Sequence, residues 1–150
     1  QLGQILTYIE KLKAADVTFG SEREAVAEAG EVNAEKRRQA QALCETVRLT
    51  LTEQSEDWKH RSLFERQWVI RDFRKTAGMP VEEWLEVLRQ LADNLQRGVI
   101  SHPPLEKLAG YYEHLAEMAK GYEKDPAKLE ESLRHVYRWR DEVKELQNAL

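Results

Sequence analysis

The apolar residues of this chain recur at intervals of three and four positions almost from end to end, and this spacing constrains the fold more than any other feature. Side chains three or four positions apart share one face of an α-helix, whereas a half-buried strand alternates every second residue. No segment shows convincing strand alternation. The expected fold is therefore all-α, an antiparallel bundle of five to six helices that forms a single domain over residues 1–150.

Capping and turn residues separate the periodic runs and set the expected helix boundaries. Ser62 and Glu65 form a capping box, Gly78 is suited to a left-handed helix end, and Asp125 with Pro126 is typical of a helix start. The predicted helices span 2–15, 22–54, 56–77, 80–97, 104–123 and 126–148.

The long predicted helix, 22–54, is unusual in its first half. Val26 and Val32 are the only large apolar residues between positions 20 and 42, and they stand among alanines. Two interpretations stay open: this half packs closely against the first helix, or it projects and mediates association by a coiled coil or by docking. The candidate self-association or docking residues are Val26, Ala29, Val32, Lys36 and Ala40.

The segment 62–78 has two different faces when it is drawn as a helix. One face is typical of a core and contains Leu63, Val69, Ile70, Phe73 and Ala77. The other, which we call the cation–aromatic stripe, contains Arg61, Phe64, Trp68, Arg71 and Lys75. Its members are spaced three or four apart, so that they form one continuous surface.

Positive charge is concentrated near this stripe. Residues 58–75 include six Lys or Arg and two Asp or Glu, although the whole chain carries a formal net charge of −4. Arginine can bind phosphate through two parallel hydrogen bonds, and an exposed aromatic ring stacks on a nucleic-acid base with about 1–3 kcal/mol. Tryptophan and arginine are also enriched at the centres of protein interfaces.

A second interpretation of the stripe assigns it to packing. In a bundle of several layers, a central helix is apolar on both sides. Phe64 and Trp68 would then belong to the core, with Arg61, Arg71 and Lys75 at its rim. We favour this core interpretation, and the exposed binding surface stays open as the alternative.

Motifs for catalysis and metal binding are missing from the sequence. The four histidines, His60, His102, His114 and His135, do not form the paired Glu-x-x-His pattern of di-iron bundles. There is no Gly-x-Ser-x-Gly motif and no glycine-rich phosphate loop. We therefore expect no enzyme activity, no metal and no cofactor.

The isoelectric point, the single cysteine and the hydropathy limit the class of protein and its expected compartment. A pI near 5.7 is not typical of a general polyanion binder, so we expect any nucleic-acid site to be local. Cys44 is the single cysteine, which excludes an intrachain disulfide, and we expect it to be a small buried hydrophobe in a reducing, cytoplasmic compartment. No run of about 20 apolar residues predicts a membrane span. Since the chain begins with Gln1, we expect it to be processed or cut from a longer protein.

These observations predict a non-enzymatic helical interaction or assembly module that binds other proteins or itself. The alternative function is a nucleic-acid-binding helical subunit of a larger complex, which would use the cation–aromatic stripe. A protein partner or a homo-oligomer is the expected assembly, nucleic acid is the alternative partner, and no membrane partner is expected.

Overall fold

The computed structural model of the chain describes the backbone of residues 21–150 and the side chains of residues 34–150. The helices are α2 (Ser21–Trp58), α3 (Leu63–Ala77), α4 (Val81–Gln96), α5 (Leu105–Tyr122) and α6 (Pro126–Ala149). No strand occurs between residues 21 and 150, so the all-α prediction is confirmed for this part of the chain. The predicted helix 2–15 lies outside the described residues, as do the side chains of Val26, Ala29 and Val32.

The boundary between the second and third predicted helices was wrong. We expected one helix to end at 54 and the next to begin at 56, whereas α2 continues to Trp58 and α3 begins at Leu63. The cause is local. The Ser62 hydroxyl accepts a hydrogen bond from the backbone N–H of Glu65, at 3.3 Å, and this bond satisfies a first-turn donor of α3. Residues 59–62 therefore form a turn between the two helices.

The other predicted helix ends match the structure to within one or two residues. Gly78 has a φ of 84° and its backbone N–H donates to the carbonyl oxygen of Arg74 at 3.0 Å, as a left-handed cap does. The Asp125 carboxylate accepts a hydrogen bond of 3.0 Å from the N–H of Ala127, and Pro126 occupies the first helical position.

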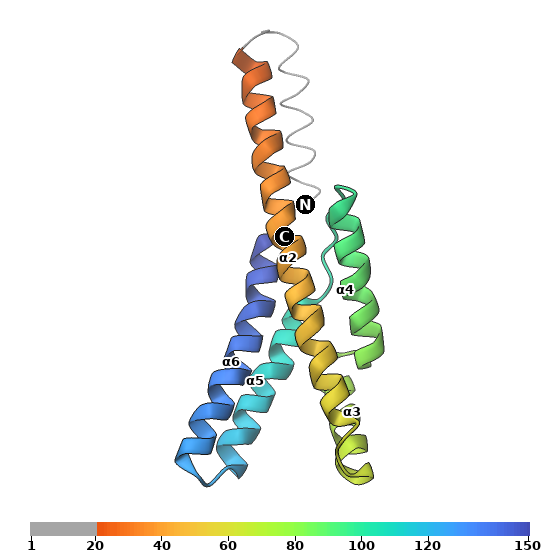
Figure 1. Cartoon of the computed structure of the whole chain (residues 1–150), viewed down its shortest axis with the longest axis vertical. Coiled ribbons are helices and arrows are strands. Elements are labelled where there is room, and N and C mark those ends of the chain that lie inside the picture. The colour runs from red at the N-terminus through yellow and green to blue at the C-terminus, as the bar shows by residue number, and fades with distance from the viewer. Residues whose placement is uncertain (1–20) are drawn as a thin grey trace.

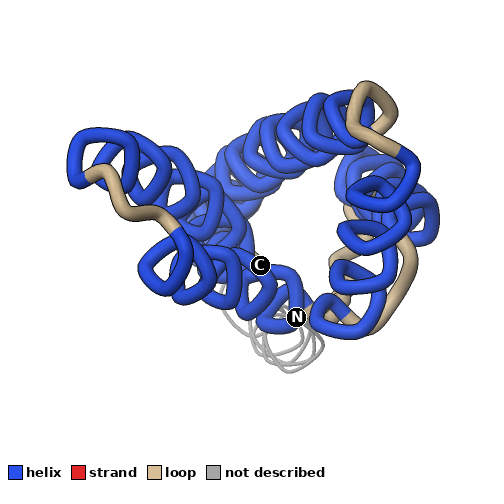
Figure 2. The backbone as a smooth tube through the Cα atoms, turned by 90° about the horizontal axis from the view of Figure 1, so that it is seen from below, coloured by secondary structure: helices blue, strands red, loops and turns tan. Residues whose placement is uncertain are grey.

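The long helix α2 organises the arrangement. It packs against α4 and against α6, while α5 and α6 form a hairpin and α3 packs mainly on α5 (Figure 1). The turn between α2 and α3 and the loop between α5 and α6 lie at the same end of the molecule but on opposite sides (Figure 2). The N-terminal part of α2 extends beyond the ends of α4 and α6 (Figure 1).

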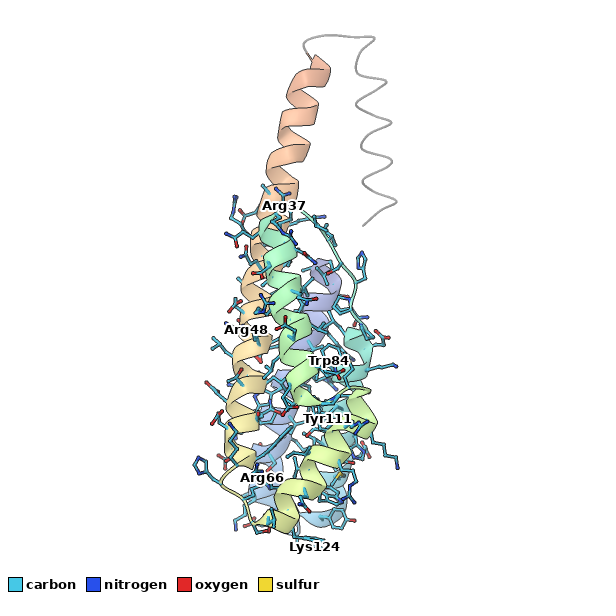
Figure 3. All side chains as sticks on the ribbon, turned by 90° about the vertical axis from the view of Figure 1, so that its right-hand side faces the viewer. Arg37, Arg48, Arg66, Trp84, Tyr111 and Lys124 are labelled. Atoms are coloured by element: carbon cyan, nitrogen blue, oxygen red, sulfur yellow. The ribbon has the colours of Figure 1, made fainter. Side chains whose placement is uncertain are left out.

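The core lies where α2 meets these neighbours. Ala40, Cys44, Val47 and Leu51 of α2 are buried and are spaced by four, three and four, which gives them one common face. The buried residues of the other helices include Phe73, Trp84, Leu88, Leu91, Leu105, Leu108, Tyr111, Tyr112, Val143 and Leu146. Figure 3 shows Trp84 and Tyr111 within this packed region. Within residues 21–150, no helix has an apolar stretch of the length that a membrane span requires.

Candidate interaction site

The first candidate site, on α2, has two residues with described side chains, Lys36 and Ala40. Ala40 is 1% exposed and belongs to the chain's own core, so its side chain cannot contact another molecule. Lys36 is exposed. The side chains of Val26, Ala29 and Val32 lie outside the described residues. Lys36 is therefore the one predicted docking residue whose side chain is described and lies at the surface.

The predicted core face of α3 is buried only toward its C-terminal end. Phe73 and Ala77 are buried and Val69 is half-buried, whereas Leu63 is 68% exposed and Ile70 is 37% exposed. The reason is the direction of the helix. The Phe73 ring meets Tyr111 of α5 edge-on, with 4.6 Å between ring centroids, while the N-terminal end of α3 diverges from the α5–α6 loop (Figures 1 and 2).

The core interpretation of the stripe is wrong for its two aromatic residues. Phe64 is 80% exposed and Trp68 is 44% exposed. A helix in the described part of the chain would have to cover the N-terminal half of α3 to bury them, and none does. The structure instead contains the alternative arrangement, an exposed cation–aromatic surface.

Four members of the stripe share the outward face of α3. Phe64, Trp68, Arg71 and Lys75 are spaced by four, three and four and are all exposed. Arg61 is different, because it lies in the turn before α3 and forms an ion pair with Asp57 at 3.5 Å.

The same helix carries two further exposed cations that sequence reasoning did not assign. These are Arg66, which lies near the end of the molecule in Figure 3, and Arg74. Within residues 34–150, no ion pair involves Arg66, Arg71, Arg74 or Lys75. Their charges are therefore available to a ligand or a partner.

Beside α3 the structure contains a cleft of about 510 Å³ that sequence reasoning missed. Its walls come from α2, the turn after it, α3, α5 and α6, and five of its lining residues are aromatic: Trp58, Trp68, Tyr111, Tyr122 and Trp139. Trp68 lies where the cleft meets the outward face of α3. No sequence signal joins these residues, because they are brought together from helices that are distant in the chain.

Histidines and acidic residues are dispersed in the described part of the chain. No group of three or more His, Cys, Asp or Glu residues there could hold a metal ion. His114 contacts Asp72, and His135 stacks on Trp139 with 6.2 Å between ring centroids. Cys44 is fully buried, as predicted, and its thiol donates a hydrogen bond of 3.0 Å to the carbonyl of Leu88.

Comparison with known proteins identifies no relative. No protein-family model, no curated protein and no solved structure matches the chain significantly. The α3 surface is therefore interpreted from its own residues.

Proposed function

We propose that the chain is a non-enzymatic helical interaction module and that the outward face of α3 binds another protein. The exposure of Phe64, at 80%, carries this proposal together with Trp68 on the same face, while the exposed Leu63 and Ile70 extend the apolar surface onto the adjoining side of α3. Single exposed apolar residues are common, but a group of large ones on one short helix marks an interaction surface. Covering a phenylalanine or leucine side chain contributes roughly 1.5–3 kcal/mol, which a partner would gain on docking.

Charge gives the expected chemistry of that partner. Arg66, Arg71, Arg74 and Lys75 lie on or beside the apolar group and have no ion-pair partner within residues 34–150. A partner surface with an apolar ridge bordered by carboxylates would complement this face. Complementary charges also accelerate encounter, so association is expected to slow as salt is raised.

A second copy of the chain is one partner to be tested. The apolar group of α3 could pack against itself across a two-fold axis, although the four cations would then repel one another. Light scattering of the purified chain at high concentration measures this directly. A mass that stays monomeric supports a different protein as the partner.

The experiment compares variants of α3 with a matched control on α2. Leu49 is a suitable control because it is 55% exposed and lies outside the α3 face. Proteins retained from a lysate by the wild type and by Leu49→Ala, but lost with Phe64→Ala, are then purified. Affinity for the purified partner should fall at least about tenfold with Phe64→Ala. Equal affinities of both variants for that partner would overturn the proposal.

The same face favours single-stranded nucleic acid as a second candidate ligand. Phe64 and Trp68 are exposed one turn apart and could stack on bases, while Arg71 and Lys75 follow on the same face and could contact phosphates. Fluorescence anisotropy with labelled single-stranded DNA, RNA and duplex tests this over a salt series. Arg71→Ala and Lys75→Ala should each reduce the log–log salt slope by about 0.7. Absence of binding at low salt would dismiss this candidate.

A further inference from the structure

The aromatic cleft beside α3 has the size and the lining of a small-molecule site. Its volume of about 510 Å³ falls in the range of roughly 300–1,000 Å³ typical of ligand pockets. Trp58 and Tyr111 are buried, Trp139 is half-buried, and Trp68 and Tyr122 are exposed. Val69, Leu115, Met118 and Ala119 complete the apolar part of the lining. An apolar group with a few polar partners fits such a lining.

The polar wall of the cleft comes mainly from α2 and is acidic. Glu53 and Asp57, one turn apart, both line the cleft and are exposed. Asp57 pairs with Arg61 at 3.5 Å, whereas Glu53 has no ion-pair partner within residues 34–150. The cleft therefore has one carboxylate whose charge is not compensated by a neighbouring cation.

The other polar groups on this wall are already engaged. The Gln54 amide donates a hydrogen bond of 2.9 Å to the Tyr112 hydroxyl, and the Thr50 hydroxyl donates one of 3.3 Å to Glu142. Burial raises the pKa of the Glu142 carboxyl, although the Thr50 hydrogen bond and the charge of Arg138 oppose that shift. In the cleft lining, Glu53 and Asp57 outnumber Arg61, which is the one cation there, so an anionic ligand would meet net negative charge and a cation an attractive field.

We propose that this cleft binds an organic ammonium ion with an apolar or aromatic body. The cation lies against the faces of the tryptophan and tyrosine rings, whose π-electrons attract positive charge. The Glu53 carboxylate supplies the counter-charge from α2, and the apolar body is received by the aliphatic part of the lining. This site lies beside the outward face of α3 and shares Trp68 with it.

The test uses benzyltrimethylammonium as the probe, with benzyl alcohol as its neutral control and benzoate as its anionic control. Binding is followed by tryptophan fluorescence and by the indole N–H signals in two-dimensional NMR. Three of the four tryptophans line the cleft, and the fourth, Trp84, lies in the core and serves as an internal reference. We expect saturable shifts for the three lining indoles with the cation, weaker binding of the alcohol and none of benzoate.

Two surface variants make the test specific. Glu53→Gln and Tyr122→Ala alter exposed residues of the lining, and each should weaken binding of the cation roughly two- to fivefold. Phe64→Ala, on the outward face of α3, should leave it unchanged, which separates this site from the proposed protein interface. Equal affinity for benzyltrimethylammonium and benzyl alcohol, or an unchanged affinity in Glu53→Gln, would overturn the proposal.

Discussion

The imidazole Nε2 of His114 lies 3.0 Å from the Asp72 carboxylate, and this contact joins α5 to α3 across 42 positions of sequence. It lies one residue from Phe73, which packs against Tyr111 of the same helix α5. The polar pair and the aromatic pair together fix the C-terminal half of α3. The exposed N-terminal half of α3 is therefore positioned by contacts made further along its own helix.

Removing the contact between His114 and Asp72 should lower the free energy of unfolding only slightly. The side chain of His114 is 36% exposed and that of Asp72 is 16% exposed, so water still reaches the pair from the histidine side and it contributes at most about 1 kcal/mol. His114→Ala is therefore expected to lower the free energy of unfolding by less than about 1 kcal/mol, measured by urea denaturation. A loss above about 2 kcal/mol would show that α3 depends on this pair far more than its exposure implies.

The two phenylalanines of α3 should respond in opposite ways to truncation. Phe73 is fully buried and contacts two aromatic rings, so Phe73→Ala should cost about 3–5 kcal/mol of unfolding free energy. Phe64 is 80% exposed, so Phe64→Ala should change stability by less than about 0.5 kcal/mol. Chemical denaturation of the two variants in parallel measures the difference. Similar losses in both would contradict the exposed position of Phe64.

Two glycine-to-alanine substitutions should also have opposite signs. Gly78 has a φ of 84°, and an added Cβ would lie 3.0 Å from the flexible Lys107 side chain. The strain of a left-handed backbone at residue 78 outweighs this side-chain contact, so Gly78→Ala should lower the free energy of unfolding by about 1–2 kcal/mol. Gly110 lies inside α5, and a Cβ there meets nothing within 4 Å. Gly110→Ala should stabilise by about 0.5–1 kcal/mol. Thermal unfolding of both variants checks the signs.

Alkaline pH should destabilise the fold through Cys44. Burial, aided by the Glu45 carboxylate, raises the pKa of this thiol from 9.0 to about 12. Below pH 9 the thiol is neutral in the folded and unfolded states, so its full contribution is present. Between these values the unfolded chain loses the proton first, and the free energy of unfolding falls as pH rises. The slope is at most about 1.4 kcal/mol per pH unit.

Cys44→Ala provides the matched control for that pH dependence. The variant is less stable at neutral pH because it leaves a small void beside Leu88, but it lacks the thiol. The difference in unfolding free energy between wild type and variant should therefore decrease above pH 9. A difference that stays constant up to pH 11 would show that the thiol does not titrate with a raised pKa.

Local signals in the sequence were sufficient for most of the helix ends. A left-handed glycine such as Gly78 and a capping aspartate such as Asp125 act within a few residues, so their effect is visible without tertiary structure. The predicted boundary between two helices near residue 55 was wrong. Helical periodicity continued through it, and only the cap at Ser62 showed where the next helix begins.

The candidate site depended on information that periodicity does not contain. An apolar residue on a helix is buried only if another helix covers it, and spacing cannot tell whether one does. Phe64 and Phe73 have the same chemistry, yet α5 reaches only the second. The cleft is harder still to predict, because Trp58, Tyr122 and Trp139 come to line one cleft only after three helices have packed.

The connections between helices also bear on how quickly the chain can reach this arrangement. The turns at 59–62, 78–80 and 123–125 are short, so neighbouring helices can find one another at little entropic cost. The contact between Thr50 and Glu142 is different, because 92 positions separate them. Docking of α6 onto α2 must close that whole loop. We therefore expect it to be the slowest step of folding, after the α5–α6 hairpin has formed.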